Sequence, residues 1–195
     1  MTAPTPPHDS REPACIGDGA AVVTLVEGPT FCLSNTHGDI VPGTSHGLFF
    51  RNTRVLSRWE LLLDGHTPEV LSVQTPEAFA GQFILRKAPR AGFRDSNLLL
   101  VRERFIAGGL RETITLENLG HESTVVSLEL HADADFADLF AVKEGRAPLH
   151  GAEPTVFGTE LVLGDLADPA RGLSVVASAG PTVIPGVLSW QIVLP

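Results

Sequence analysis

Apolar and polar residues alternate with a period of two along most of this chain, and turn residues interrupt the alternation repeatedly. In the segment 54–64, Val55 and Trp59 fall on one face and Arg58 and Glu60 on the other. Successive side chains of a strand point to opposite faces of a sheet, so the pattern predicts strands with one buried face. The 19 glycines and 15 prolines supply the dense turns that such a fold needs.

Short strands of this kind are expected from residue 21 to the end, and we find no helix-period segment longer than about two turns. The alternation breaks in 133–140, where one helical turn is expected. We therefore predict an all-β fold, an antiparallel β-sandwich of the super-sandwich type with roughly a dozen short strands in two packed sheets. The expected strands are 21–26, 30–34, 54–64, 69–75, 81–86, 96–105, 110–118, 124–130, 155–157, 160–163, 173–177 and 187–193.

The domain organisation follows from the same pattern. Residues 1–20 begin as a polar, proline-bearing stretch, which predicts a disordered N-terminal tail. Residues 21–195 are expected to form one β-sandwich domain. The two cysteines, Cys15 and Cys32, are expected to be reduced thiols, and Cys32 lies in an apolar run typical of a core strand.

The charge balance excludes several classes of partner. The chain has 14 basic and 23 acidic residues, a net charge of −9, whereas nucleic-acid binding needs clustered lysine and arginine. No apolar run reaches membrane-spanning length, and no basic start leads into an apolar signal segment. We therefore expect no nucleic-acid or membrane partner and a cytoplasmic location.

The sequence contains no motif typical of a metal site or of a catalytic nucleophile. The seven histidines are scattered without ligating spacing. Asp133, Asp135 and Asp138 lack the glycine and glutamate of a calcium loop, so capping a short turn is the expected role. A serine nucleophile elbow and a phosphate-binding glycine loop are also missing. The sequence thus predicts no catalytic residue, no metal and no cofactor.

A sugar site usually offers aromatic rings that stack on the sugar, and this chain offers few. It has no tyrosine and two tryptophans, Trp59 and Trp190, and Trp59 falls on the apolar face of its predicted strand. Arginine is more distinctive, because Arg51, Arg54 and Arg58 follow two phenylalanines. Two interpretations stay open: these arginines form a polar docking surface, or they pair with the acids of 133–138.

Several separated segments resemble one known family, the N-terminal domain of bacterial glycogen-debranching (amylo-α-1,6-glucosidase-like) proteins. The resemblance runs in order over about residues 28–151. It is carried by 37–40 (HGDI), 46–61 (HGLFFRNTRVLSRWEL), 102–105 (RERF) through 117–118 (EN), and 133–140 (DADFADLF).

The resemblance implies a non-catalytic front domain. In that family a β-sandwich precedes an (α/α) barrel that holds the catalytic carboxylates, so the context is a glycoside hydrolase but no catalytic residue transfers to this chain. Whether the chain alone is an enzyme stays uncertain. The alternatives are a stand-alone carbohydrate-binding module and a small enzyme with its own carboxylate pair in a deep pocket.

The partners implied are the catalytic barrel domain, on the same or a companion polypeptide, a second copy in a homodimer, and an α-glucan. A front domain needs a polar face for its partner, and arginine and aromatic residues are enriched in such patches. We predict that Arg51 or Arg54, together with His37, Asp39 or His46, lies on one partly exposed surface that contacts the substrate or the neighbouring domain.

Overall fold

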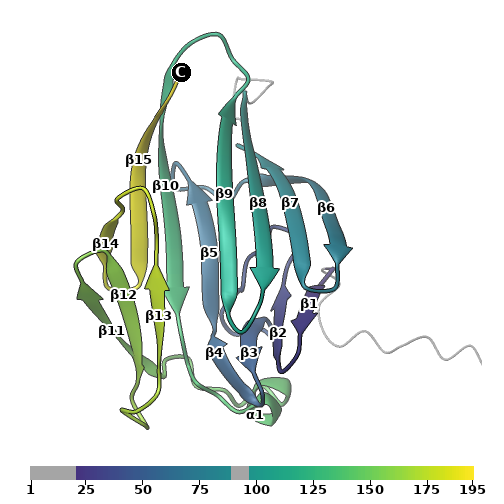
Figure 1. The fold of residues 1–195 in the computed structure, drawn as a ribbon, viewed down its shortest axis with the longest axis vertical. Helices are drawn as coiled ribbons and strands as arrows, with labels where there is room; N and C mark the ends of the chain where they lie inside the picture. The colour runs from purple at the N-terminus through teal and green to yellow at the C-terminus, as the bar shows by residue number, and fades with distance from the viewer. Residues whose placement is uncertain (1–20, 89–96) are drawn as a thin grey trace, which may run out of the picture.

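The computed structural model describes residues 21–88 and 97–195. The tail predicted for residues 1–20, including Cys15, lies outside the described residues. Within the described part the chain forms fifteen strands and one short helix, α1 (Leu139–Lys143) (Figure 1). The prediction of an all-β fold is confirmed. No helix in this part has the length and apolarity that crossing a bilayer requires.

The strands form four antiparallel sheets. Three of the sheets consist of strands that are consecutive in the chain. One contains β1 (Val23–Glu27), β2 (Thr30–Ser34), β3 (Gly47–Phe50) and β4 (Thr53–Leu56), and a second contains β6 (Glu69–Glu77), β7 (Ala80–Arg86), β8 (Leu98–Ile106) and β9 (Leu110–Asn118). The third of these consists of β11 (Ala152–Phe157), β12 (Glu160–Asp165) and β13 (Gly172–Val176). The remaining sheet has the order β14 (Thr182–Ile184), β15 (Val187–Leu194), β10 (Thr124–Asp133) and β5 (Arg58–Leu63).

The described strands divide among four small sheets, a finer division than the two packed sheets that the sequence predicted. One expectation needs correction. The predicted single strand 54–64 is broken at Ser57, where the N–H donates to the carbonyl of Asp133 at 2.8 Å. Before the break β4 pairs with β3, and after it β5 pairs with β10. The alternation of residues continues through such a change of partner, so periodicity alone does not reveal it.

One main hydrophobic core joins the four sheets. Alternate residues of β5 and β8 are buried, among them Leu61, Leu63 and Leu100, as period-two alternation predicts. The core also includes β10 and β12 residues such as Leu130 and Leu163. Strand β8 packs against β1 and β2, β9 packs against β15, and β13 packs against β4.

The predicted turns agree with the structure. Gly28 connects β1 and β2 with a φ of +54°, and Gly108 connects β8 and β9 with a φ of +70°; glycine occupies this left-handed region without a steric penalty. The predicted helical turn is present as α1. Its cap is the side chain of Asp138, which accepts a hydrogen bond from the Phe140 N–H at 2.8 Å, so the expected capping role is confirmed for Asp138.

Candidate functional site

Two arginines on the inward face of β8 form the centre of a buried polar network. Arg102 and Arg104 are each 0% exposed. The Nε atoms of Arg102 and Arg104 lie 2.8 Å and 2.7 Å from the two carboxylate oxygens of Glu112 on β9. Glu112 is the register partner of Arg104 in the β8–β9 pairing, so one carboxylate bridges two neighbouring arginines.

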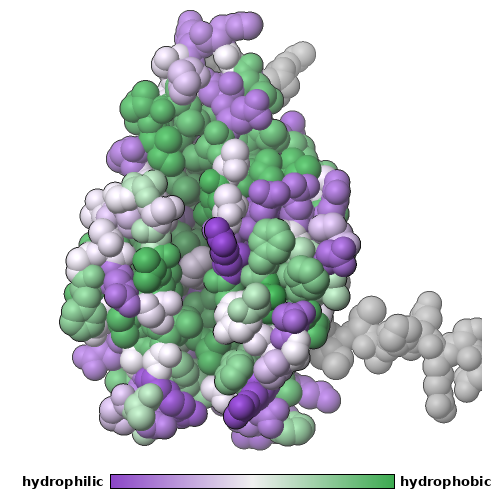
Figure 2. Space-filling view, viewed as in Figure 1, coloured by the Kyte–Doolittle hydropathy of each residue, from purple (hydrophilic) through white to green (hydrophobic). Residues whose placement is uncertain are grey.

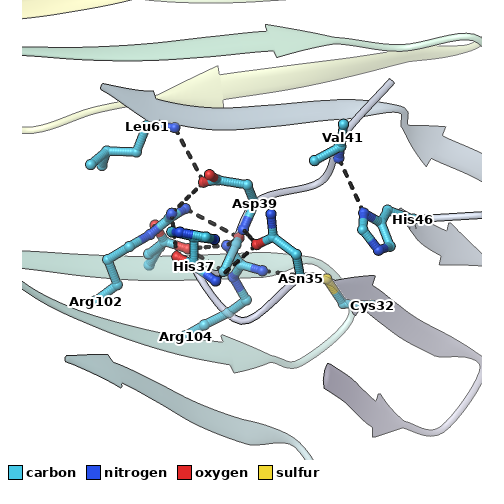
Figure 3. A network of polar contacts seen from close by, with 11 residues as sticks. Cys32, Asn35, His37, Asp39, Val41, His46, Leu61, Arg102 and Arg104 are labelled. Atoms are coloured by element: carbon cyan, nitrogen blue, oxygen red, sulfur yellow. Dashed lines mark hydrogen bonds and ion pairs between the residues drawn. The ribbon is translucent and has the colours of Figure 1, made fainter. Parts of the chain in front are cut away.

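The loop 35–40, between β2 and β3, closes this network from the other side (Figure 3). Arg102 Nη1 donates to Asp39 Oδ1 at 2.5 Å and to the His37 carbonyl at 2.8 Å. The Gly38 carbonyl accepts hydrogen bonds from both arginines. Four segments of the chain therefore meet in this network, β8, β9, the loop 35–40 and β5, because Asp39 Oδ1 also accepts the Leu61 N–H of β5 at 3.2 Å.

The conformation of this loop depends on a side-chain amide and a glycine. Asn35 Oδ1 accepts the backbone N–H groups of His37 at 2.9 Å and Asp39 at 2.8 Å. Gly38 has a φ of +81°, and a β-carbon there would lie 3.1 Å from the ring of Phe83. The close approach lets the carbonyl of Gly38 face the arginines.

Electrostatic interactions keep Glu112 and Arg104 ionised. Burial alone would raise the pKa of Glu112, but the attraction and hydrogen bonds of Arg102 and Arg104 outweigh it and hold that pKa below its ordinary value. Burial alone would lower the pKa of Arg104, and the attraction of Glu112 together with smaller contributions holds it above its ordinary value. A general acid needs a proton near neutral pH, so Glu112 in this state is a structural anion.

The thiol of Cys32 lies beside the same network. Its Sγ is 3.7 Å from Arg104 Nη1, and the residue is a buried, free cysteine, as predicted. Burial raises the pKa of this thiol, and the nearby arginine offsets only part of that rise. The thiolate is the reactive form of cysteine, so Cys32 is a core residue rather than a nucleophile.

A second buried ion pair connects β4 to the segment before α1. Arg54, which is 3% exposed, donates from Nε to both carboxylate oxygens of Asp135 at 3.1 Å. Its Nη1 donates to the carbonyls of Thr44 at 2.9 Å and His46 at 3.0 Å. Burial lowers the pKa of His46, whose Nδ1 accepts the Val41 N–H at 3.4 Å.

Three of the five predicted site residues are buried, and two have solvent-exposed area. Asp39, His46 and Arg54 are buried, because each one belongs to a hydrogen-bonded loop or ion pair inside the domain. Arg51 is exposed, with its guanidinium 5.3 Å from the ring centre of Phe50. His37 is partly buried, and its Nδ1 has no partner among the described residues.

For Arg54 the alternative interpretation, pairing with the acids of 133–138, is confirmed. Sequence reasoning missed the centre formed by Arg102 and Arg104. The sequence did contain a sign of it, because both arginines occupy alternate positions that continue the series of the apolar residues Leu98, Leu100 and Ile106, on the inward face of β8. Charges on the buried face of a strand indicate a buried ion-pair network.

An open cleft of about 620 Å³ lies between β9 and β13. Figure 2 shows it as a hollow on the viewed face, with apolar residues at its base. Leu130 of β10, Trp59 of β5 and Trp190 of β15 line it. The Trp190 Nε1–H donates to the Ser178 carbonyl at 3.3 Å, whereas the buried Nε1–H of Trp59 has no partner among the described residues.

The cleft offers little for chemistry. Its one lining carboxylate is Glu112, already bound by two arginines, and its lining cation is Arg111. Within 21–88 and 97–195, no group of three or more histidine, cysteine, aspartate or glutamate side chains could hold a metal ion. The described residues thus define an all-β domain with buried ion pairs and an apolar cleft.

Comparison with known families identifies this domain further. The family described as the N-terminal domain of (some) glycogen debranching enzymes matches residues 25–195, and the chain belongs to that family. The resemblance predicted from the sequence is confirmed, and the match extends past the 28–151 span to β15. No curated protein matches the chain at a significant level.

Proposed function

We propose that this chain is a non-catalytic N-terminal β-sandwich domain of a glycogen-debranching, α-1,6-glucosidase-type glycoside hydrolase. Its role is to support and border a separate (α/α) barrel catalytic domain, on the same or a companion polypeptide, in the carbohydrate metabolism of the cytoplasm. The family match over 25–195 supports the context. The ion pairs of Glu112 with Arg102 and Arg104 support the non-catalytic part of the proposal, because the lining of the cleft then has no free carboxylate.

The contacts between the sheets support a two-layer arrangement. We assign β6–β9 with β11–β13 to one layer, and β1–β4 with β14, β15, β10 and β5 to the other. Strands β8, β9 and β13 of the first layer pack against β1, β2, β15 and β4 of the second. Inward-facing residues of both layers share one core, as in a sandwich.

The test of the non-catalytic role is an assay of the purified chain on pullulan and glycogen, with reducing ends measured over a day. We expect no release of sugar above a buffer blank. Turnover that disappears on substitution of a single Asp or Glu would refute the proposal. Co-elution with an (α/α) barrel domain of the family, against elution of the chain alone, tests the supporting role and reveals any homodimer.

A carbohydrate-binding module is the second candidate, favoured by the position of Trp190 on the cleft. An aromatic ring beside a groove can stack on the apolar face of a sugar. Titration with maltohexaose, followed by tryptophan fluorescence, tests this function with Trp190→Ala as the variant. The matched control is Phe157→Ala, because Phe157 is exposed and lies on β11 outside the cleft lining. Binding lost only in Trp190→Ala supports the module.

A further inference from the structure

The two strands that flank the cleft each end a sheet. Strand β9 is the last strand of the order β6-β7-β8-β9, and β13 is the last of the order β11-β12-β13. Both line the cleft, β9 through Leu110 to Ile114 and β13 through Leu173 to Val176. An edge strand presents unpaired N–H and C=O groups that can pair with another extended chain.

The register shows which groups of β9 are unpaired. In an antiparallel pair, residues alternate between those that exchange hydrogen bonds with the partner strand and those that do not. The N–H of Leu119 donates to Asn97, so odd positions of β9 bond to odd positions of β8. The N–H and C=O groups of Glu112 and Ile114 therefore face the free edge.

The same argument applies to β13. The N–H of Asp165 donates to the Arg171 carbonyl, so odd positions of β13 bond to β12. The backbone groups of Gly172, Ser174 and Val176 face the other way, toward the free edge. No described residue forms a backbone hydrogen bond with these groups.

The directions of the two edges set the number of strands that fits between them. In Figure 1, β9 and β13 run the same way, with β10 and β5 behind the space between them. A single strand that runs opposite to both would be antiparallel to each neighbour. It would join the two sheets of this layer into one antiparallel sheet, β6-β7-β8-β9 on one side of it and β13-β12-β11 on the other.

The size and lining of the cleft agree with one short strand. A strand residue in a packed sheet fills roughly 160 Å³, from a ~3.3 Å rise, ~4.8 Å between strands and ~10 Å between layers. The cleft of about 620 Å³ then holds about four residues. Its base is mainly aliphatic, which suits alternate apolar side chains better than a sugar. The base residues include Leu48, Leu56, Leu128, Leu130 and Ile192.

We propose that the cleft is a strand-acceptor site. Its occupant is one extended segment, apolar at alternate positions, of the polypeptide that carries the companion barrel domain. The segment pairs with the free edges of β9 and β13, in the recognition mode known as β-strand addition. This inference rests on the proposed function for the source of the segment, and it explains how a front domain would attach its partner.

The test uses a synthetic probe, acetyl-KTVTVTVTK-amide, and hydrogen–deuterium exchange resolved by residue. We expect the peptide to slow exchange at the amides of Glu112, Ile114, Ser174 and Val176. The amide of Arg111 is the internal control, because it is already bonded to β8 and its exchange should change little. A control peptide with N-methyl groups at alternate residues loses the donors of one edge and should leave one strand unprotected. No slowing at either edge would overturn the proposal.

A matched pair of variants tests the backbone directly. Ser174→Pro removes the N–H that faces the free edge and leaves the β12 ladder intact, and proline is tolerated at strand edges. Ser174→Ala loses the same hydroxyl contact with Glu160 but keeps the N–H. We expect about tenfold weaker peptide binding for Ser174→Pro than for Ser174→Ala, the effect of about one hydrogen bond. Equal affinities for the two variants would overturn edge pairing.

Two further outcomes would also overturn the proposal. Maltohexaose that protects the cleft residues and displaces the peptide would assign the site to a sugar. Protection that rises with protein concentration in the absence of peptide would assign it to a second copy of the chain. These results are independent of the hydrolysis assay, so a failure of the strand-acceptor site leaves the non-catalytic role standing, and the reverse also holds.

Discussion

Asp39 and Arg102 are 63 positions apart in the chain, yet Asp39 Oδ1 lies 2.5 Å from Arg102 Nη1. Both residues belong to segments that carry the family resemblance, 37–40 and 102–105. The other two such segments, 46–61 and 133–140, also meet, through Arg54 and Asp135. The residues that mark the family in this chain therefore form the ion pairs that connect its loops to its sheets.

Replacement of Arg102 by methionine is expected to destabilise the domain by about 3–5 kcal/mol. The change leaves Asp39 buried and Glu112 with one arginine in place of two, and an unpaired buried charge is costly. The measurement is the free energy of unfolding in urea. Arg86→Met is the control, since the Arg86–Glu69 pair has side chains 40% and 43% exposed and should change stability by less than about 1 kcal/mol. Similar losses in the two variants would contradict a structural role for the network.

Gly38→Ala is expected to cost more stability than Gly43→Ala. Both glycines have positive φ, +81° and +74°, so an alanine meets backbone strain at each. Only at Gly38 does the new β-carbon meet a ring, that of Phe83 at 3.1 Å, whereas Gly43 has nothing within 4 Å. The difference between the two midpoints of thermal unfolding measures the cost of the contact between the new β-carbon and the Phe83 ring. Equal midpoints would show that the loop can move away from β7.

The network predicts a loss of stability on acidification. The pKa of Glu112 is lower in the folded protein than in the unfolded chain, so the folded state binds the proton less readily. The stabilisation is complete above the unfolded value of about 4.5, and it is lost as pH falls through the lower folded pKa. Urea midpoints measured from about pH 6 to pH 3 should therefore fall. The fall should be smaller in Glu112→Gln; an unchanged slope would assign the acid sensitivity to other carboxyls.

Cys32 is expected to resist alkylation in the native state. The thiol is buried and its pKa is raised, so few thiolates form and reagent reaches them only through opening of the fold. A Cys15→Ser variant leaves Cys32 as the single thiol of the chain. Iodoacetamide should modify it at least about a hundredfold more slowly than in 8 M urea. Comparable rates in the two conditions would show that this core position is open to solvent.

The positions of most strands could be predicted from the sequence, because a strand with one buried face alternates apolar and polar residues with a period of two. That signal predicted the hairpins at Gly28 and Gly108 and the burial of Trp59 and Cys32. It did not predict the break at Ser57, because a strand that changes partners keeps its alternation. It also did not predict how the strands divide among sheets, since pairing between distant strands depends on packing rather than on local pattern.

The candidate site was less accessible from the sequence. Arg54 drew notice because of its neighbours, and its pairing with an acid of 133–138 was among the interpretations. The role of Arg102 and Arg104 depends on a loop some 65 positions earlier, and no local pattern encodes that contact. The sequence did not reveal the cleft for a similar reason, because residues of seven strands line it: β3, β4, β5, β9, β10, β13 and β15.

The order of the sheet β14-β15-β10-β5 has a consequence for synthesis on the ribosome. Strand β10 lies between β5, made earlier, and β15, made later. From Asp133 to Val187, 54 residues must be added before the second neighbour begins to emerge. At about 5–20 residues per second this takes roughly 3–11 s. During that interval the backbone groups on one edge of β10 remain unpaired in the nascent chain. We therefore expect ribosome-associated chaperones that cover such edges to increase the yield of folded protein.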